Sequence, residues 1–146
     1  MLIGKSDEDY MRMALDEARI AGQNGEVPIG AVIVNAGQVI ARAHNLTEAL
    51  NDVTAHAEMQ AITIAEGECG KYLTDCAIYV TVEPCIMCAG ALGWSQISKV
   101  VYGASDPKRG YTQFSPSALH PKCVVKSGIL EEECAELMKK FFKKKR

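Results

Sequence analysis

The chain has 146 residues, 48% of them apolar and 23% charged, which predicts one globular domain over residues 1–146 that needs no disulfides to fold. No apolar run approaches the roughly 20 residues of a membrane span and the N-terminus has no signal-peptide core, so we expect a cytoplasmic protein that contacts no membrane. The formal net charge of −2 is uneven, because the segment 139–146 holds six basic residues and no acidic one.

The N-terminal part of the chain is predicted to form an amphipathic helix followed by a β-hairpin. Ser6 can cap the helix, with Asp9 three residues further on. The β-branched run 29–34 is typical of a buried strand, and residues 39–43 return as a second strand after a turn at 35–38. The apolar face of the helix comprises Met11, Ala14, Leu15, Ala18 and Ala21.

The remainder of the chain alternates helices with strands. The long stretch 104–121 is rich in turn residues, which indicates a functional loop. Strands that alternate with helices, together with the initial hairpin, predict an α/β layered sandwich with a mixed sheet. The predicted elements are a helix over 55–66, a strand over 76–81, a helix over 84–95, a strand over 99–102, a short strand over 122–126 and a closing helix over 130–141.

Two short segments, 54–58 and 83–88, carry the residues that suggest chemistry. Cys85 and Cys88 are three residues apart in the first turn of a predicted helix, where both sulfurs can point to one side and the helix N-terminus favours thiolates. His56 also lies in the first turn of a predicted helix. These three residues predict a site for one zinc ion per chain, and three protein ligands leave a fourth position for water, as in catalytic zinc sites.

Glu58 lies two residues after His56, too close along a helix to be an easy fellow ligand. We expect its carboxylate to lie against the open position of the metal, where it can take a proton from water and deliver it to a ring nitrogen and to a leaving amine. Hydrolytic removal of an amino group needs such a carboxylate.

The spacing of Cys85 and Cys88 by itself would also suit a redox pair or half of a structural zinc site. A redox pair usually lacks a His-x-Glu partner, and a structural Cys₃His site would need a fourth ligand from the other cysteines, none of which is paired in spacing. A catalytic zinc site therefore fits the sequence better. The remaining cysteines show no ligand spacing and are interpreted as small core residues; they are Cys69, Cys76, Cys123 and Cys134.

The pattern H-x-E followed by P-C-x-x-C is the signature of zinc-dependent nucleobase deaminases. The chain resembles the cytidine and deoxycytidylate deaminase superfamily, and within it the bacterial tRNA-specific adenosine deaminases, over nearly its whole length. The similar stretches are 25–32, 43–45, 54–58, 79–92, 101–104 with Asp106 and Lys108, and 127–142.

The resemblance implies a three-layer α/β/α sandwich with a five-stranded mixed sheet, a homodimer, and conversion of the wobble adenosine of a tRNA anticodon to inosine. It also implies that Asn45 hydrogen-bonds the flipped base and that the backbone at Ala57 lines the base pocket. Departures from the usual pattern weaken the substrate assignment and leave the chemistry untouched; they are Val53, Trp94, 110–114 and 120–124. Trp94 is interpreted as a core or dimer-interface residue.

The basic C-terminal segment has two interpretations. Lysines at a helix C-terminus complement the helix dipole, but six cations in eight residues also suit a phosphate backbone. We expect RNA contacts from this tail and from the long loop, at Lys108, Arg109, Lys143, Lys144, Lys145 and Arg146.

Two alternative functions stay open from the sequence. A zinc-stabilised nucleic-acid-binding module without catalysis would not need Glu58. A deaminase of free guanine or cytosine would not need the basic tail, because a free base carries no phosphates.

Overall fold

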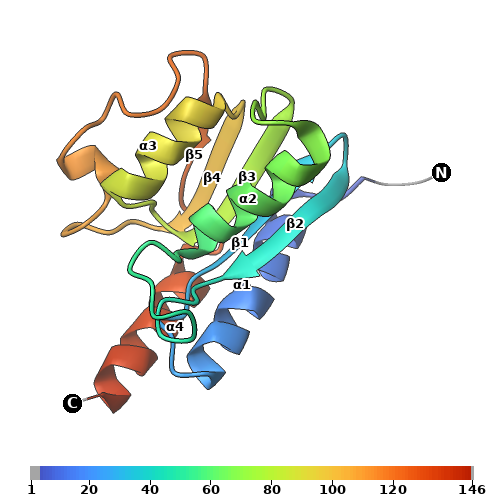
Figure 1. Ribbon diagram of the computed structural model, residues 1–146. Helices are drawn as coiled ribbons and strands as arrows, with labels where there is room; N and C mark the ends of the chain where they lie inside the picture. Colours follow the sequence, from blue (N-terminus) through green and yellow to red (C-terminus); the bar gives the residue numbers. More distant parts are fainter. Residues whose placement is uncertain (1–3, 146) are drawn as a thin grey trace.

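The computed structural model describes residues 4–145, in which one five-stranded sheet lies between two layers of helices (Figure 1). The predicted α/β sandwich with a five-stranded mixed sheet is therefore confirmed. The elements are α1 (Asp7–Gln23), β1 (Gly30–Asn35), β2 (Gln38–His44), α2 (Ala57–Cys69), β3 (Cys76–Val82), α3 (Ile86–Ser95), β4 (Lys99–Ala104), the 3-10 turn η1 (Tyr111–Gln113), β5 (Val124–Lys126) and α4 (Glu131–Lys144).

The strands follow the order β2-β1-β3-β4-β5 across the sheet. β1 runs antiparallel to both β2 and β3, whereas β3, β4 and β5 are parallel to one another. The carboxyl ends of β3 and β4 therefore meet at one edge of the sheet, and the segments that follow them, 83–85 and 105–109, begin side by side. The backbone confirms this, because the Glu83 N–H donates to the Ala104 carbonyl at 2.8 Å.

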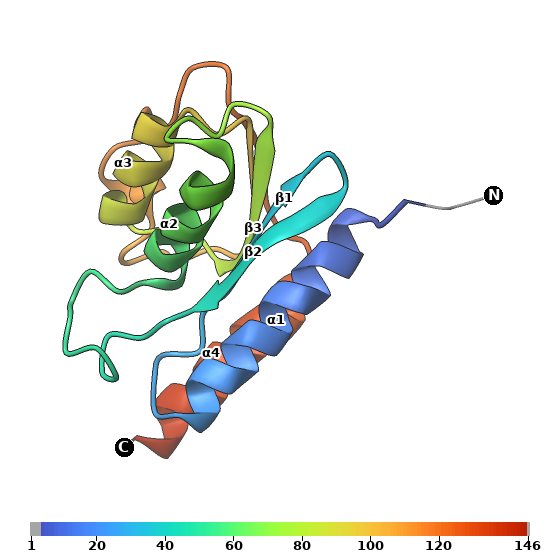
Figure 2. The same cartoon turned by 45° about the vertical axis from the view of Figure 1, so that its right-hand side comes forward.

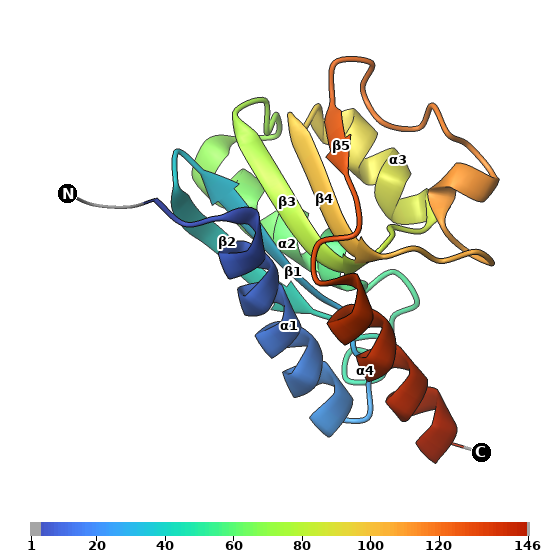
Figure 3. The same cartoon turned by 180° about the vertical axis from the view of Figure 1, so that it is seen from behind.

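Each face of the sheet is covered by two helices. α2 and α3 cover one face, and α1 and α4 cover the other (Figures 2 and 3). Alternate residues of one strand enter the two cores: Ile33 packs on the α2 side, while Val32 and Val34 pack on the α1 side. Because both faces are buried, the central strands are continuous apolar runs, which is why their positions are predictable from sequence.

Several predicted boundaries were wrong by a few residues. α2 begins at Ala57 and ends at Cys69, so His56 is its N-cap and not a residue of its first turn. α3 begins at Ile86, which leaves Pro84 outside the helix. The chain turns tightly just before α2, where the His56 N–H donates to the Thr54 carbonyl at 2.8 Å, and this turn delays the start of the helix.

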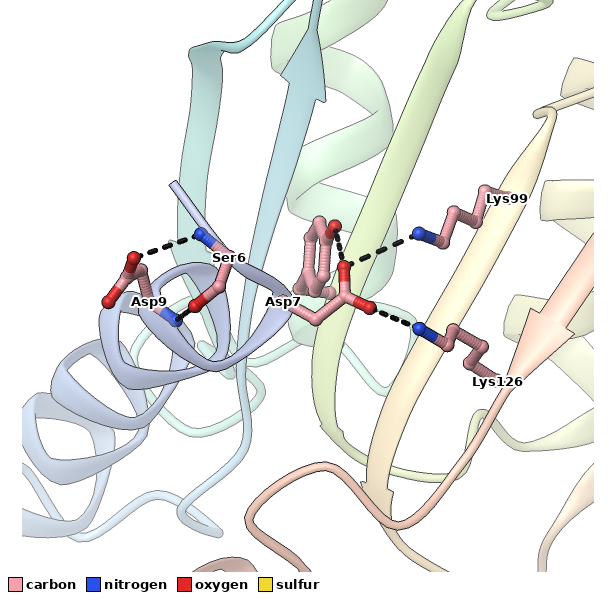
Figure 4. Close-up of polar contacts among 6 residues, drawn as sticks. Ser6, Asp7, Asp9, Lys99 and Lys126 are labelled. Carbon is pink, nitrogen blue, oxygen red and sulfur yellow. Dashed lines mark hydrogen bonds and ion pairs between the residues drawn. The ribbon is translucent and has the colours of Figure 1, made fainter. Parts of the chain in front are cut away.

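The N-terminus of α1 is fixed by two sets of polar contacts (Figure 4). Ser6 and Asp9 form the predicted capping box, with the Asp9 N–H donating to Ser6 Oγ at 3.2 Å. Asp7 accepts from Tyr79 Oη at 2.6 Å and pairs with Lys126 Nζ at 2.7 Å and with Lys99 Nζ. These contacts tie α1 to three parallel strands of the sheet.

Replacing Asp7 by Asn is expected to lower the free energy of unfolding by about 1 kcal/mol at neutral pH. Burial alone would raise the pKa of Asp7, but the hydrogen bonds from Lys126 and Tyr79 and the charge of Lys99 hold it at about 2, below the ordinary value of 3.8. A depressed folded-state pKa contributes stability that is present above about pH 4 and is lost as the pH falls towards 2. Urea unfolding of both proteins checks this, since their difference should shrink on acidification; a difference that stays constant would contradict it.

Among residues 4–145, no helix combines the length and the apolarity that crossing a membrane requires.

Candidate metal centre

The three predicted ligands come together where two helices begin. His56 is the N-cap of α2, Cys85 is the N-cap of α3, and Cys88 lies in the first turn of α3. Both N-caps have extended backbone, which turns the side chains off the helix ends and towards one another. Within the described residues, they form the one group of three His, Cys or acidic side chains whose donor atoms all lie within 4.8 Å of one another.

The donor atoms have the spacing that zinc requires. His56 Nδ1 lies 3.6 Å from Cys85 Sγ and 3.6 Å from Cys88 Sγ. Zinc bonds of about 2.3 Å to sulfur and about 2.0–2.1 Å to nitrogen, arranged on a tetrahedron, place sulfur and nitrogen about 3.5 Å apart. The hydrogen bond from Cys88, with a further contribution from His56, lowers the pKa of Cys85 to about 4, so a thiolate is already favoured there. The geometry and the donor set therefore fit a zinc ion.

Glu58 lies in the first turn of α2 with only 3% of its surface exposed. Its Oε1 is the one buried side-chain oxygen or nitrogen in residues 4–145 that has no hydrogen-bond partner. Burial, with a smaller effect from the neighbouring Cys85, raises the pKa of Glu58 to about 7. A buried carboxyl group with a free oxygen and a pKa near neutrality is suited to accepting and returning a proton.

A cleft of about 750 Å³ opens over these residues. His56, Glu58 and Cys85 lie on its lining, and Val27 and Ile29 contribute an apolar wall. The rest of the lining comes from the end of β3 with Glu83, from the end of β4 and the segment after it, and from one side of α4. The last two of these parts bring Lys108, Arg109, Met138, Phe142 and Lys145 to the cleft.

Residues 4–104 match the family model for the cytidine and deoxycytidylate deaminase zinc-binding region. The chain belongs to this family. It is 48% identical to the tRNA-specific adenosine deaminase of Agrobacterium fabrum, over 94% of each chain, and 47% identical to that of Bacillus subtilis, over 96% of this chain and 91% of the relative. A solved structure from a study of A-to-I editing by tRNA:A34 deaminases superposes with a TM-score of 0.82 at 48% identity, covering 88% of this chain and 97% of that one.

The residues expected to bind the base have structural roles in this deaminase. Asn45 is buried, and its Oδ1 accepts from the Ala57 N–H at 2.8 Å, which joins the loop after β2 to the start of α2. Ala57 is fully buried. Neither residue is part of the cleft lining, so their contact with substrate stays a prediction.

The basic residues expected to bind RNA lie in different hollows of the surface. Lys145 joins Lys108 and Arg109 in the cleft of the deaminase, and Lys143 lines an adjoining hollow with Lys108. Lys144 lies on another side of α4, in a hollow between α4 and α1. Arg146 lies outside the described residues.

Some residues of the cleft were missed by sequence reasoning. Glu83 lies directly before Pro84, but no spacing rule marks it as a member of the site. Met138 falls in the predicted closing helix and Phe142 in the basic segment 139–146, and neither carries a motif that assigns it to the site. Their position four residues apart on α4 was the available signal, since it places both on one side of the helix.

Proposed function

We propose that this deaminase converts the wobble adenosine of a tRNA anticodon to inosine by hydrolysis. The observation that carries the proposal is near-complete coverage at 47–48% identity by two relatives named tRNA-specific adenosine deaminase. Three basic side chains on the cleft lining support a phosphate-bearing substrate, because a free base offers no phosphates to Lys108, Arg109 and Lys145. Such a substrate implies a cytoplasmic enzyme.

In the proposed mechanism His56 Nδ1, Cys85 Sγ and Cys88 Sγ hold the zinc ion, which activates water at neutral pH when bound. Glu58 Oε1 accepts one proton from the attacking water and delivers it to the ring nitrogen. It then takes the second proton from the hydroxyl group added to the ring carbon and passes it to the amino group, which leaves as ammonia as its bond to the ring breaks. Because Glu58 Oε1 has no hydrogen-bond partner and the pKa of Glu58 is raised, this carboxyl group is suited both to accepting a proton and to giving it up.

The substrate must present an unstacked base. A base inside a duplex cannot reach the metal ligands, whereas an anticodon loop supplies an unpaired nucleotide at small cost. Val27 and Ile29 offer the apolar wall that a base can pack against, with Asn45 nearby at the start of α2. We therefore propose that the nucleotide enters the cleft base first while its phosphates face Lys108, Arg109 and Lys145.

Incubation with a transcribed anticodon stem-loop that contains adenosine at the wobble position tests the proposal directly. We expect inosine in the stem-loop, detected by nucleoside mass spectrometry, and no comparable release of ammonia from free guanine, cytosine or adenine. Turnover of a free base at the faster rate would replace the proposal with a nucleobase deaminase.

Lys145 and Lys144 lie on different sides of the basic tail and therefore offer a matched pair of variants. Lys145→Ala is expected to weaken stem-loop binding and to reduce the log–log salt slope by about 0.7 to 0.9, the value of one lost phosphate contact. Lys144→Ala, which removes the same charge from the other side of α4, should change both quantities much less. Fluorescence anisotropy at several salt concentrations measures both; equal effects of the two variants would mean that only overall charge matters.

We also propose that the enzyme is a homodimer joined through the face that carries α3. Trp94 is 85% exposed, so it does not belong to the core of the chain. It lines a shallow hollow with Ile86 and Leu119. Phe114, which is also exposed, directly precedes Ser115, another residue that lines this hollow. A patch of exposed large apolar side chains is typical of a protein interface. Trp94→Glu should shift the mass measured by analytical ultracentrifugation from dimer to monomer; a wild-type monomer would refute the assignment.

A further inference from the structure

Glu83 has a buried carboxylate, and both of its oxygens accept hydrogen bonds from a single loop. Only 5% of the residue is exposed, and it lies at the carboxyl end of β3, two residues before the ligand Cys85. Its Oε1 accepts from the Asp106 N–H at 3.1 Å. Its Oε2 accepts from the Thr112 N–H at 3.1 Å and from Thr112 Oγ1 at 2.7 Å. One side chain thus holds both ends of the segment 106–112.

The same segment closes tightly around this carboxylate. Gly110 packs so closely that a Cβ atom there would collide with the Glu83 carboxyl group. The Tyr111 N–H donates to the Pro84 carbonyl at 2.9 Å, and Cys85 and Gly110 form an isolated β-bridge. The loop is therefore built against the strand end that leads to the metal ligands.

Asp106 continues the chain of contacts towards the cations. Its Oδ1 accepts from the backbone N–H groups of Lys108 and Arg109, each at 3.0 Å. The turn that presents both cations to the cleft is thus formed on Asp106, and the backbone of Asp106 is held by Glu83.

We propose that Glu83 is a positioning residue that fixes Lys108 and Arg109 over the cleft and so sets the affinity for the RNA substrate. This inference rests on the proposed function. The charge of Glu83 by itself would weaken RNA binding, because Glu83 is an anion on the lining of a cleft that receives a polyanion. Removing its charge should tighten RNA binding if only charge matters, and should weaken binding if Glu83 holds the loop.

The test compares Glu83→Gln with wild type. Glutamine keeps one acceptor oxygen but presents an amide group to a backbone donor, so one end of the segment 106–112 loses its anchor. We expect the dissociation constant for the anticodon stem-loop to rise on the order of tenfold. KM should rise by a similar factor, kcat should fall much less, and the zinc content should stay unchanged. Hydrogen–deuterium exchange without RNA should show faster exchange of the Asp106 and Thr112 amides.

Two further variants separate positioning from general damage. Thr112→Val removes one hydroxyl donor and leaves the Asp106 contact, so it should change the dissociation constant less than about twofold. Asp106→Ala breaks the turn beyond Glu83 and should weaken binding as Glu83→Gln does, which tests the same chain of contacts if Glu83→Gln fails to fold. In a Lys108→Ala/Arg109→Ala background, Glu83→Gln should have no further effect on RNA affinity.

Unchanged or tighter RNA binding by folded Glu83→Gln would overturn the proposal, as would a full additional loss in the double-alanine background. If wild type binds no stem-loop, the proposed function fails instead, and the exchange of the Asp106 and Thr112 amides then decides by itself whether Glu83 holds the turn.

Discussion

Glu58→Gln is expected to lower kcat by a factor of roughly 10² to 10⁴ while the protein keeps one zinc ion per chain. Glutamine has nearly the same volume, so the buried position beside His56 stays filled, but it cannot accept and return a proton. Glu58 is given several proton transfers in the proposed mechanism, which places the loss towards the upper end of that range. Steady-state kinetics on the stem-loop, with elemental analysis of the same sample, measures both quantities.

A suitable control lies on the same helix. Glu68→Gln replaces an exposed carboxylate near the end of α2 and should leave kcat unchanged. A Glu58→Gln protein that retains a tenth of wild-type turnover would contradict the assignment of Glu58 as the proton carrier, whereas loss of zinc in that variant would give Glu58 a role in metal binding.

Cys88→Ala should lose both zinc and activity. Outer-shell residues that only orient a ligand are worth 10- to 100-fold in metal affinity, so removal of one of three direct ligands should cost more than about 100-fold. The purified variant should hold well below one zinc ion per chain, and turnover should fall with it.

Cys69→Ala is the matched control for this experiment. It removes an exposed thiol at the end of α2, outside the metal centre, and should keep full zinc and full turnover. A Cys88→Ala protein that still holds one zinc ion per chain would mean that the metal is bound elsewhere.

The elements of the fold were predictable because the central strands are buried on both faces and the outer helices α1 and α4 are amphipathic. Boundaries were harder, since the turn that makes His56 an N-cap depends on contacts among residues 52–56 that follow no periodicity. The metal ligands and Glu58 were predictable because their spacing along the chain reflects two helix starts, although the sequence alone does not show that those starts face one another.

The remaining parts of the site depend on tertiary contacts. The role of Glu83 follows from loop residues more than twenty positions away, and nothing local distinguishes it from a surface glutamate. The basic tail is continuous in sequence, but the turn of a helix sends Lys145 and Lys144 to different sides. Such assignments need the positions of α4 and of the segment 105–113 relative to the sheet.

The cleft draws its lining from both helix layers, which has a consequence for how its specificity can change. The ligands and Glu58 lie at the starts of α2 and α3 on one face of the sheet, whereas Met138, Phe142 and the C-cap Lys145 lie towards the end of α4 on the other face. Mutations in the last helix can therefore change the lining of the cleft without replacing a metal ligand or Glu58. A designer who wishes to change which substrates enter the cleft would accordingly vary the final helix and the segment after β4, and leave the starts of α2 and α3 intact.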